Sequence, residues 1–213
     1  IYYNGQLAEG SDLTELTQQG IIEFAFGDQG IMYPFVPEIG ILGLHYLFPT
    51  DIEKVFDFMN ESESIEYLSS LLQEQGFYPW VWASEGFQWM SLNKLVTSPA
   101  DFVGVRFRTQ SSDIEMANFS AYGASPTVIP FSEIYTALQL GTIDGQQQPN
   151  RGIYNMKYYE VCDYAIDMRA QNYYIYPFSP TSFIEGLPDY VFELVQECMN
   201  ETNDYYEEFL IND

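Results

Sequence analysis

Two arginines in a short predicted strand are the residues of this sequence best suited to chemistry. Arg106 and Arg108 stand two positions apart in the segment GVRFR, in a chain with 31 acidic residues against 7 lysines and arginines. Residues two apart on an extended segment point to the same face, away from the intervening Phe107. A guanidinium at a strand end can hold a carboxylate through two parallel hydrogen bonds. The pattern predicts an anion site or cations that balance nearby acids, and the spacing does not choose between the two arginines.

The rest of the sequence carries no signature of catalysis. It has no GxSxG elbow, no glycine-rich loop before a lysine, no GxGxxG after a strand and no HExxH. The only histidine, His45, stands among apolar and aromatic residues and is interpreted as core or cleft wall. Acid pairs such as Glu207 and Glu208 fall on predicted helix surfaces, although carboxylates of the glycosidase type are spaced in three dimensions and stay open. The prediction is a binding protein, not an enzyme, with no cofactor.

Composition limits the partners of the chain. The chain has 213 residues, of which 46% are apolar and 17% are aromatic. This length and composition predict a folded protein of one large domain or two small lobes. A net charge of -24 disfavours nucleic acid and anionic membrane surfaces, and it suits a solvated surface in salty water. No window approaches eighteen apolar residues, so no membrane insertion is predicted. The chain begins at Ile1 without an initiator methionine, which favours a fragment or a processed chain.

The two cysteines carry little functional information. Cys162 and Cys198 lie thirty-six positions apart without a CxxC motif, and with one histidine a zinc site of the usual type is not expected. A disulfide and two buried free thiols are both compatible with the sequence.

The predicted elements alternate between strands and helices. Helices are expected at 11–19, with Ser11 as cap and Gly20 as stop, and at 51–59, 63–75, 112–122, 132–140 and from 188 onward. Strands are expected at 21–26, 77–83, 87–92, 104–108, 127–129 and 142–144. This alternation predicts an α/β protein with a largely parallel sheet. Because the chain has no flexible linker, two lobes would be joined by ordered crossing segments that act as a hinge.

Two sets of apolar residues receive specific predictions. The final helix is expected to pack on the body through one face, made of Val191, Leu194, Val195, Cys198, Thr202, Tyr205 and Phe209. A cluster of aromatic residues has two interpretations, an apolar cleft wall that would favour a hydrophobic acid or plain core, of which core is favoured. Its members are Phe77, Tyr78, Trp80, Trp82, Phe87 and Trp89.

Three segments together carry a family resemblance: GVRFR, YGASPTVIPFSEIYTALQLGTIDGQQQP, and KYYEV at 157–161. In order and spacing they resemble the solute-binding subunits of tripartite ATP-independent periplasmic (TRAP) transporters, of the DctP type. The resemblance continues more weakly from NGQLAEGSDL through FAFGDQG to SFIEGLPDYVFELV. Full-length members have an opening strand and helix and C-terminal helices that this sequence lacks, so a chain truncated at both ends is expected.

The resemblance implies a two-lobe periplasmic binding protein fold, class II-like, with a hinge and an interlobe ligand cleft. The expected organisation is lobe I mainly in 1–85, lobe II and crossing hinge segments in 86–178, and a helical return in 179–213. It also implies a periplasmic protein that captures an organic acid and delivers it to the TRAP membrane subunits. A ligand-sensing module of the same fold and an enzyme acting on an acidic substrate are the alternatives.

The resemblance assigns roles to five residues. Arg108 matches the arginine that clamps the ligand carboxylate, and Lys94 falls where many members place a second basic ligand contact. Gln148 replaces the usual asparagine of the family, and one more methylene changes the reach of its amide. Phe131 matches an aromatic pocket wall, with core as the other interpretation. Asp28 matches a polar pocket position, although an aspartate beside glycine also forms turns.

Overall fold

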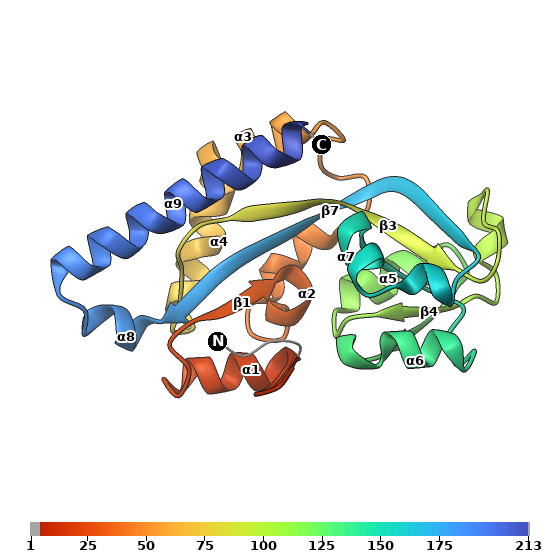
Figure 1. Cartoon of the computed structure of the whole chain (residues 1–213), viewed down its shortest axis with the longest axis horizontal. Coiled ribbons are helices and arrows are strands. Elements are labelled where there is room, and N and C mark those ends of the chain that lie inside the picture. The colour runs from red at the N-terminus through yellow and green to blue at the C-terminus, as the bar shows by residue number, and fades with distance from the viewer. Residues whose placement is uncertain (1–4, 213) are drawn as a thin grey trace.

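The molecule is built on one open sheet, of which two strands are long. The computed structural model describes residues 5–212. The strand order is β1-β7-β3-β6-β4-β5, with β2 paired to β7. Figure 1 shows β3 (Ala83–Leu92) and β7 (Tyr164–Pro180) running side by side through the length of the molecule. The short strands are β1 (Ala25–Asp28), β2 (Phe77–Pro79), β4 (Arg106–Thr109), β5 (Ser125–Val128) and β6 (Gly145–Pro149).

The expectation of a largely parallel sheet is wrong. Among the described strands, β4 is parallel to β5 and β6, whereas the pairs β1–β7, β2–β7, β3–β6 and β3–β7 are antiparallel. The reason is β7, a 17-residue strand absent from the predicted elements, which returns antiparallel to β3 and accepts β1 and β2 along its second half.

The helices mostly follow the sequence pattern. They are α1 (Gly10–Gln18), α2 (Gln29–Met32), α3 (Ile52–Glu61), α4 (Glu63–Glu74), α5 (Asp113–Ala121), α6 (Ile134–Gln139), α7 (Asn150–Asn155), α8 (Thr181–Glu185) and α9 (Asp189–Asn212), with 3-10 turns η1 (Pro37–Gly43), η2 (Pro99–Phe102), η3 (Phe131–Glu133) and η4 (Tyr158–Glu160). Side chains of Asp51, Ser62 and Ser112 cap α3, α4 and α5, as the residue types favour. Ser11 lies inside α1, and Glu9 takes the N-cap position without a side-chain bond.

Some predicted strands shift or shorten. The segment 21–26 becomes a strand only from Ala25, and Phe24 and Phe26 are exposed, so this strand is not buried on both faces. The segment 77–83 divides into β2, which ends at Pro79, and β3, which begins at Ala83. The strand expected at 142–144 begins instead at Gly145.

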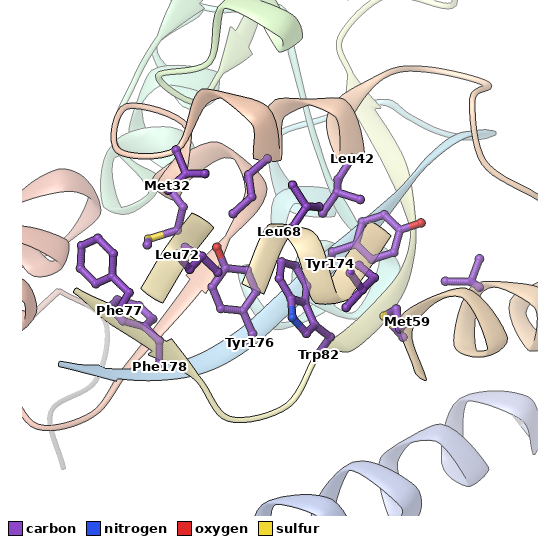
Figure 2. Packing of buried hydrophobic residues seen from close by; sticks show 14 of the residues in the cluster. Met32, Leu42, Met59, Leu68, Leu72, Phe77, Trp82, Tyr174, Tyr176 and Phe178 are labelled. Atoms are coloured by element: carbon purple, nitrogen blue, oxygen red, sulfur yellow. The ribbon is translucent and has the colours of Figure 1, made fainter. Parts of the chain in front are cut away.

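Three hydrophobic clusters form the core. The largest contains Met32, Val36, Leu68, Leu72, Phe77, Trp82, Tyr174, Tyr176 and Phe178 among others. Figure 2 shows the rings of Phe77, Trp82, Tyr174, Tyr176 and Phe178 gathered around Leu68 and Leu72 of α4. The ring centroids of Trp82 and Tyr176 lie 4.3 Å apart, and each fully buried side chain of this size contributes roughly 1.5–3 kcal/mol. Phe77 and Trp82 are therefore core residues, as favoured from the sequence.

The clusters divide the molecule into two bodies. The largest cluster draws its buried residues from 25–82 and 174–178, whereas the other two draw theirs from 90–158. In Figure 1 the first body holds α1, α2, β1 and α4, the second holds α5, α6, α7 and β4, and β3 and β7 pass between them. We call them lobe I and lobe II. The exact boundaries at 85 and 178 remain predictions.

The final helix forms as predicted but contacts the body through a partly different face. Leu194, Tyr205 and Phe209 of the predicted face are exposed. The less exposed positions of α9 are Val191, Phe192, Val195, Gln196, Met199, Asn203, Tyr206, Glu207 and Leu210, so Val191 and Val195 of the predicted face are among them. Aromatic packing of Phe192 on Trp80 and hydrogen bonds from Gln196 to Trp80 O and from Asn60 to Glu207 set this rotation, and helical periodicity alone does not contain those partners.

Candidate functional site

Arg108 is a buried cation near the end of β4. Only 5% of it is exposed, and its Nε donates to the carbonyl oxygen of Ile129 at 2.9 Å. Within residues 5–212 it forms no ion pair, and no hydrogen bond engages its Nη atoms. Arg106, at the start of the same strand, is exposed and donates from Nε to Asp144 Oδ2 at 2.9 Å. The structure thus separates the two arginines: Arg106 forms an ion pair with an acid, and Arg108 forms none among the described residues.

Uncommitted polar groups share the face of β6 next to Arg108. Phe107 pairs with Gly145, so alternation places Gln146 and Gln148 on the same face as Arg108. Gln146 is fully buried, and neither atom of its amide has a hydrogen-bond partner among the described residues. Tyr158 is also fully buried with a free hydroxyl, and the charge of Arg108 acts to lower the pKa of this phenol, which burial raises to about 12. We call Arg108, Gln146, Gln148 and Tyr158 the arginine cluster.

A second group joins the two lobes through Asp28. This carboxylate caps α2 by accepting from the amides of Gly30 at 2.7 Å and Ile31 at 3.0 Å. It also accepts from Gln110 Nε2 at 3.0 Å and from the hydroxyl of Tyr173 at 2.7 Å. Because Gln110 follows Arg108 by two residues, Asp28 of lobe I lies beside the arginine cluster of lobe II. Burial and the charge of Asp28 raise the pKa of Tyr173, which keeps it a hydrogen-bond donor.

Glu115 is a second buried acid, and it binds Gln110 from within lobe II. Its Oε2 accepts from Gln110 N at 2.8 Å, and its Oε1 accepts from Gln147 Nε2 at 3.3 Å. Burial raises its pKa, and the Gln110 hydrogen bond and the charge of Arg108 partly offset that shift. We call Asp28, Gln110, Glu115 and Tyr173 the acid seam.

A pocket of about 590 Å³ opens beside these groups, between the start of α3, β3, α7 and the end of α9. Trp89 and Asn150 line it, and they adjoin Gln148 because Trp89 pairs with Gln148 across the sheet and Asn150 follows Pro149. The volume is within the range of small-molecule sites. Glu85 also lines it: burial and the charge of Asp28 raise the pKa of Glu85, and Arg151 opposes the shift.

The other sequence-predicted residues are placed less closely. Phe131 opens η3, two residues after the carbonyl that Arg108 holds, and 36% of it is exposed. Lys94 is exposed and donates to the carbonyl oxygen of Asp101 at 2.7 Å. It follows Leu92, which pairs with Gly145 at the opposite end of β6 from Gln148, a separation of about 10 Å along the strand. The structure does not bring Lys94 to the arginine cluster, because β3 runs antiparallel to β6.

Sequence reasoning missed Gln146, Tyr158, Gln110 and Tyr173. Gln146 and Tyr158 belong to segments that carry the family resemblance, but a glutamine or tyrosine in a strand or turn has no chemical signature of its own. Gln110 and Tyr173 acquire their roles only through Asp28, which lies 82 and 145 residues away along the chain. No local pattern contains such pairs.

Further contacts cross between the lobes. The hydroxyl of Ser132 in η3 donates to Glu9 Oε1 at 2.6 Å, and Asn118 Nδ2 in α5 donates to Gly43 O at 2.8 Å. His45 Nδ1 lies 2.8 Å from the hydroxyl of Tyr122, whose ring stacks on the imidazole. These contacts are hydrogen bonds between polar groups, and the ring of Phe119 also packs edge-on against His45.

Two bodies joined by paired strands, with unmatched polar groups where they meet, define the class of two-lobe solute-binding proteins. The model of the DctP family, bacterial extracellular solute-binding proteins of family 7, matches residues 1–212. The chain belongs to this family. Its members are binding subunits of transport systems and not enzymes, and they work outside the cytoplasm, so the predicted fold, non-enzymatic class and periplasmic localisation are confirmed.

Relatives whose names include a ligand are similar over nearly the whole chain. The ectoine-binding periplasmic protein TeaA of Halomonas elongata is 32% identical over 206 residues, 96% of this chain and 60% of the relative. The C4-dicarboxylate-binding periplasmic protein DctP of Rhodobacter capsulatus is 31% identical over 207 residues, 96% of this chain and 61% of the relative. The structure of the Halomonas elongata ectoine-binding protein superposes with a TM-score of 0.94 at 31% identity, covering 98% of this chain and 68% of that one. The chain thus spans about 60% of the length of these two relatives.

Two further features are the state of the cysteines and the apolar length of the helices. Cys162 and Cys198 are both free thiols, and Cys198 is exposed on α9 rather than buried. No helix within residues 5–212 is long and apolar enough to cross a membrane.

Proposed function

We propose that this chain captures an organic acid between its lobes and delivers it to the membrane subunits of a TRAP transporter. The observation that carries the proposal is Arg108, a guanidinium that is 95% buried and has no anionic partner among the described residues. An isolated buried charge is costly, and a carboxylate that completes it removes much of that cost. The named ligands of the relatives, ectoine and C4-dicarboxylates, all contain a carboxylate.

In this proposal Arg108 is the carboxylate clamp, and the neighbouring amides orient the rest of the ligand. Its planar fork presents two parallel N–H groups, which matches a carboxylate better than an ammonium group does. Gln148 and Gln146 present amide groups on the same face, and Phe131 stands at the rim. Asp28 holds Gln110 and Tyr173 in place across the lobe boundary.

Arg108→Ala, compared with Arg106→Ala, tests the proposal. Both variants remove one guanidinium from the same face of β4, but Arg106 already has Asp144 as its partner. A thermal-shift screen against organic acids finds the ligand, because a ligand of the native state raises the melting temperature. Isothermal titration then gives its dissociation constant for each variant. We expect Arg108→Ala to weaken binding about 30-fold or more and Arg106→Ala to leave it nearly unchanged.

Equal affinity of Arg108→Ala and the parent would overturn the assignment of the clamp. Arg108→Lys separates charge from geometry, and we expect an intermediate loss because lysine keeps the charge without the fork. Absence of a shift with every acid in the screen would overturn the proposed function.

A further inference from the structure

The cations of this chain are few enough to account for one by one. All seven lysines and arginines lie within residues 5–212. Arg106, Lys157 and Arg169 pair with Asp144, Glu160 and Asp167. Lys94 donates to a backbone carbonyl at the far end of β6, and Lys54 is exposed on α3.

Arg151 is the remaining cation near the pocket, and its surroundings already balance it. Its Cζ lies 4.0 Å from the centre of the Phe209 ring, and it lines the pocket together with Glu85. Its positive charge opposes the upward pKa shift of Glu85. Arg108 is therefore the one cation that a ligand at the arginine cluster meets without a competing acid in contact.

Buried acids lie near that single cation without pairing with it. Asp28 and Glu115 are 3% and 2% exposed, and both bind Gln110, two residues from Arg108. Glu85 stands on the neighbouring wall of the pocket, close enough to Asp28 for the two charges to interact. The other groups in reach are neutral: the amides of Gln146 and Gln148 and the hydroxyl of Tyr158.

From this arrangement we infer that the ligand is a monocarboxylate whose remaining polar groups are neutral or cationic, and that dicarboxylates are rejected. The inference rests on the proposed function and narrows its substrate class. Arg108 takes the one carboxylate, and Gln146, Gln148 and Tyr158 supply uncharged donors and acceptors for hydroxyl, amide or ring N–H groups. A cationic group is favoured further by Asp28 and Glu85.

At the arginine cluster a second carboxylate would find no second cation, because Arg151 and Arg169, which line the adjoining pocket, are engaged by Glu85, Phe209 and Asp167. It would lose water on entering the site without gaining an ion pair. Neutral amides hydrogen-bond a carboxylate but do not balance its charge. The named ligands of the two relatives differ in their number of carboxylates. Ectoine has one carboxylate and a cationic ring, whereas C4-dicarboxylates have two carboxylates.

Matched acid pairs test the inference. Succinate, glutarate and adipate are compared by isothermal titration with their monoamides, succinamate, glutaramate and adipamate, and with ectoine. Each monoamide has nearly the shape of its diacid, but an amide replaces one carboxylate. We expect the monoamides or ectoine to bind at least tenfold more tightly than every diacid, and Arg108→Ala to abolish the difference.

Gln148→Lys provides a gain-of-binding test. A cation at position 148 would give a second carboxylate its partner, so we expect the ratio of succinate to succinamate affinity to rise at least tenfold. Gln139→Lys is the matched control, because it makes the same change in charge on the exposed side of α6. Glu85→Gln is the second variant if Gln148→Lys fails to fold, and it should raise the same ratio by removing a negative charge.

The possible outcomes distinguish failure of this inference from failure of the proposed function on which it rests. A diacid that binds as tightly as its monoamide, with Arg108→Ala abolishing both, would overturn the inference and leave the proposed function standing. No binding of any acid, in a sample with a normal melting transition, would overturn both.

Discussion

Arg106 and Arg108 have the same side chain, the same strand and the same face, yet the structure makes them different groups. Arg106 is exposed at the start of β4 and meets Asp144, whereas Arg108 is buried near the end of the strand and meets a backbone carbonyl. The alternation of a strand predicts their common direction from the sequence. Which one lies beside uncommitted amides depends on the register of β6, and that register is a long-range property.

His45 allows a prediction at the same scale. Burial lowers its pKa from 6.5 to about 4, partly offset by the side chain of Gln171. The folded state therefore favours the neutral imidazole, and its contribution to stability is complete above pH 6.5 and is lost as the pH falls toward 4. The free energy of unfolding from urea titrations should fall between pH 7.5 and pH 5 by about 1–2 kcal/mol more in the parent than in His45→Gln. Carboxylates titrate in both proteins, so their effect cancels; parallel pH profiles would contradict the prediction.

At the scale of elements, the short helix α2 positions the acid seam. Its N-cap Asp28 uses one carboxylate oxygen for the helix amides and both oxygens for Gln110, so the cap of a lobe I helix is also a lobe II contact. The sequence predicts the cap, because aspartate before a helix start favours one. It does not predict the contact with Gln110, which comes from a distant part of the chain.

Gly30 of α2 makes this contact possible. A Cβ at position 30 would lie 2.1 Å from Gln110 Oε1 and 2.9 Å from Gln110 Cβ, so rotating the amide does not relieve the clash. We expect Gly30→Ala to displace Gln110, hold the lobes apart and weaken the ligand identified in the screen about tenfold or more, with a larger radius of gyration by small-angle scattering. Gly43→Ala is the control, because its nearest new contact is an ordinary 3.7 Å to Gln171. Equal effects of the two variants would show that the close approach of Gly30 to Gln110 is not required for closure.

Glycine, capping and turn residues predict the ends of most helices to within two residues. The predicted ends of the strands agree less well with the structure. The helices at 51–59, 63–75 and 112–122 have local caps, and each was confirmed as α3, α4 or α5. β7 was missed and the sheet was assigned the wrong direction, because strand pairing is decided by partners far along the chain. The face through which α9 packs on the body is predicted only in part, for the same reason.

At the scale of the whole molecule, charge dominates. A net charge of -24 on 213 residues gives self-repulsion that favours expansion, and dissolved ions screen it. Hydrogen bonds between the lobes include acids of lobe I, such as Asp28 with Gln110 and Glu9 with Ser132. Stability and closure should therefore both depend on ionic strength.

Salt should stabilise this protein. We expect the melting temperature in calorimetry to rise by several degrees between about 0.05 M and 1 M NaCl, with most of the rise at the low end where the screening length changes fastest. Potassium chloride should act equally, because screening depends on ionic strength and not on the particular cation. A melting temperature independent of salt would show that the surface acids are already neutralised within the fold.

The sequence by itself determined the family, the α/β class, the binding rather than catalytic character and the importance of the segment that contains Arg108, because these depend on residue types and short spacings. Tertiary structure alone decided that Arg108 and not Arg106 or Lys94 is the uncompensated cation, that Gln146 and Tyr158 stand beside it, and that Asp28 joins the lobes through Gln110 and Tyr173. The physical reason is that a charge acquires its chemical role from the groups within a few ångströms of it. In this chain those groups come from segments that lie 21 to 145 residues apart.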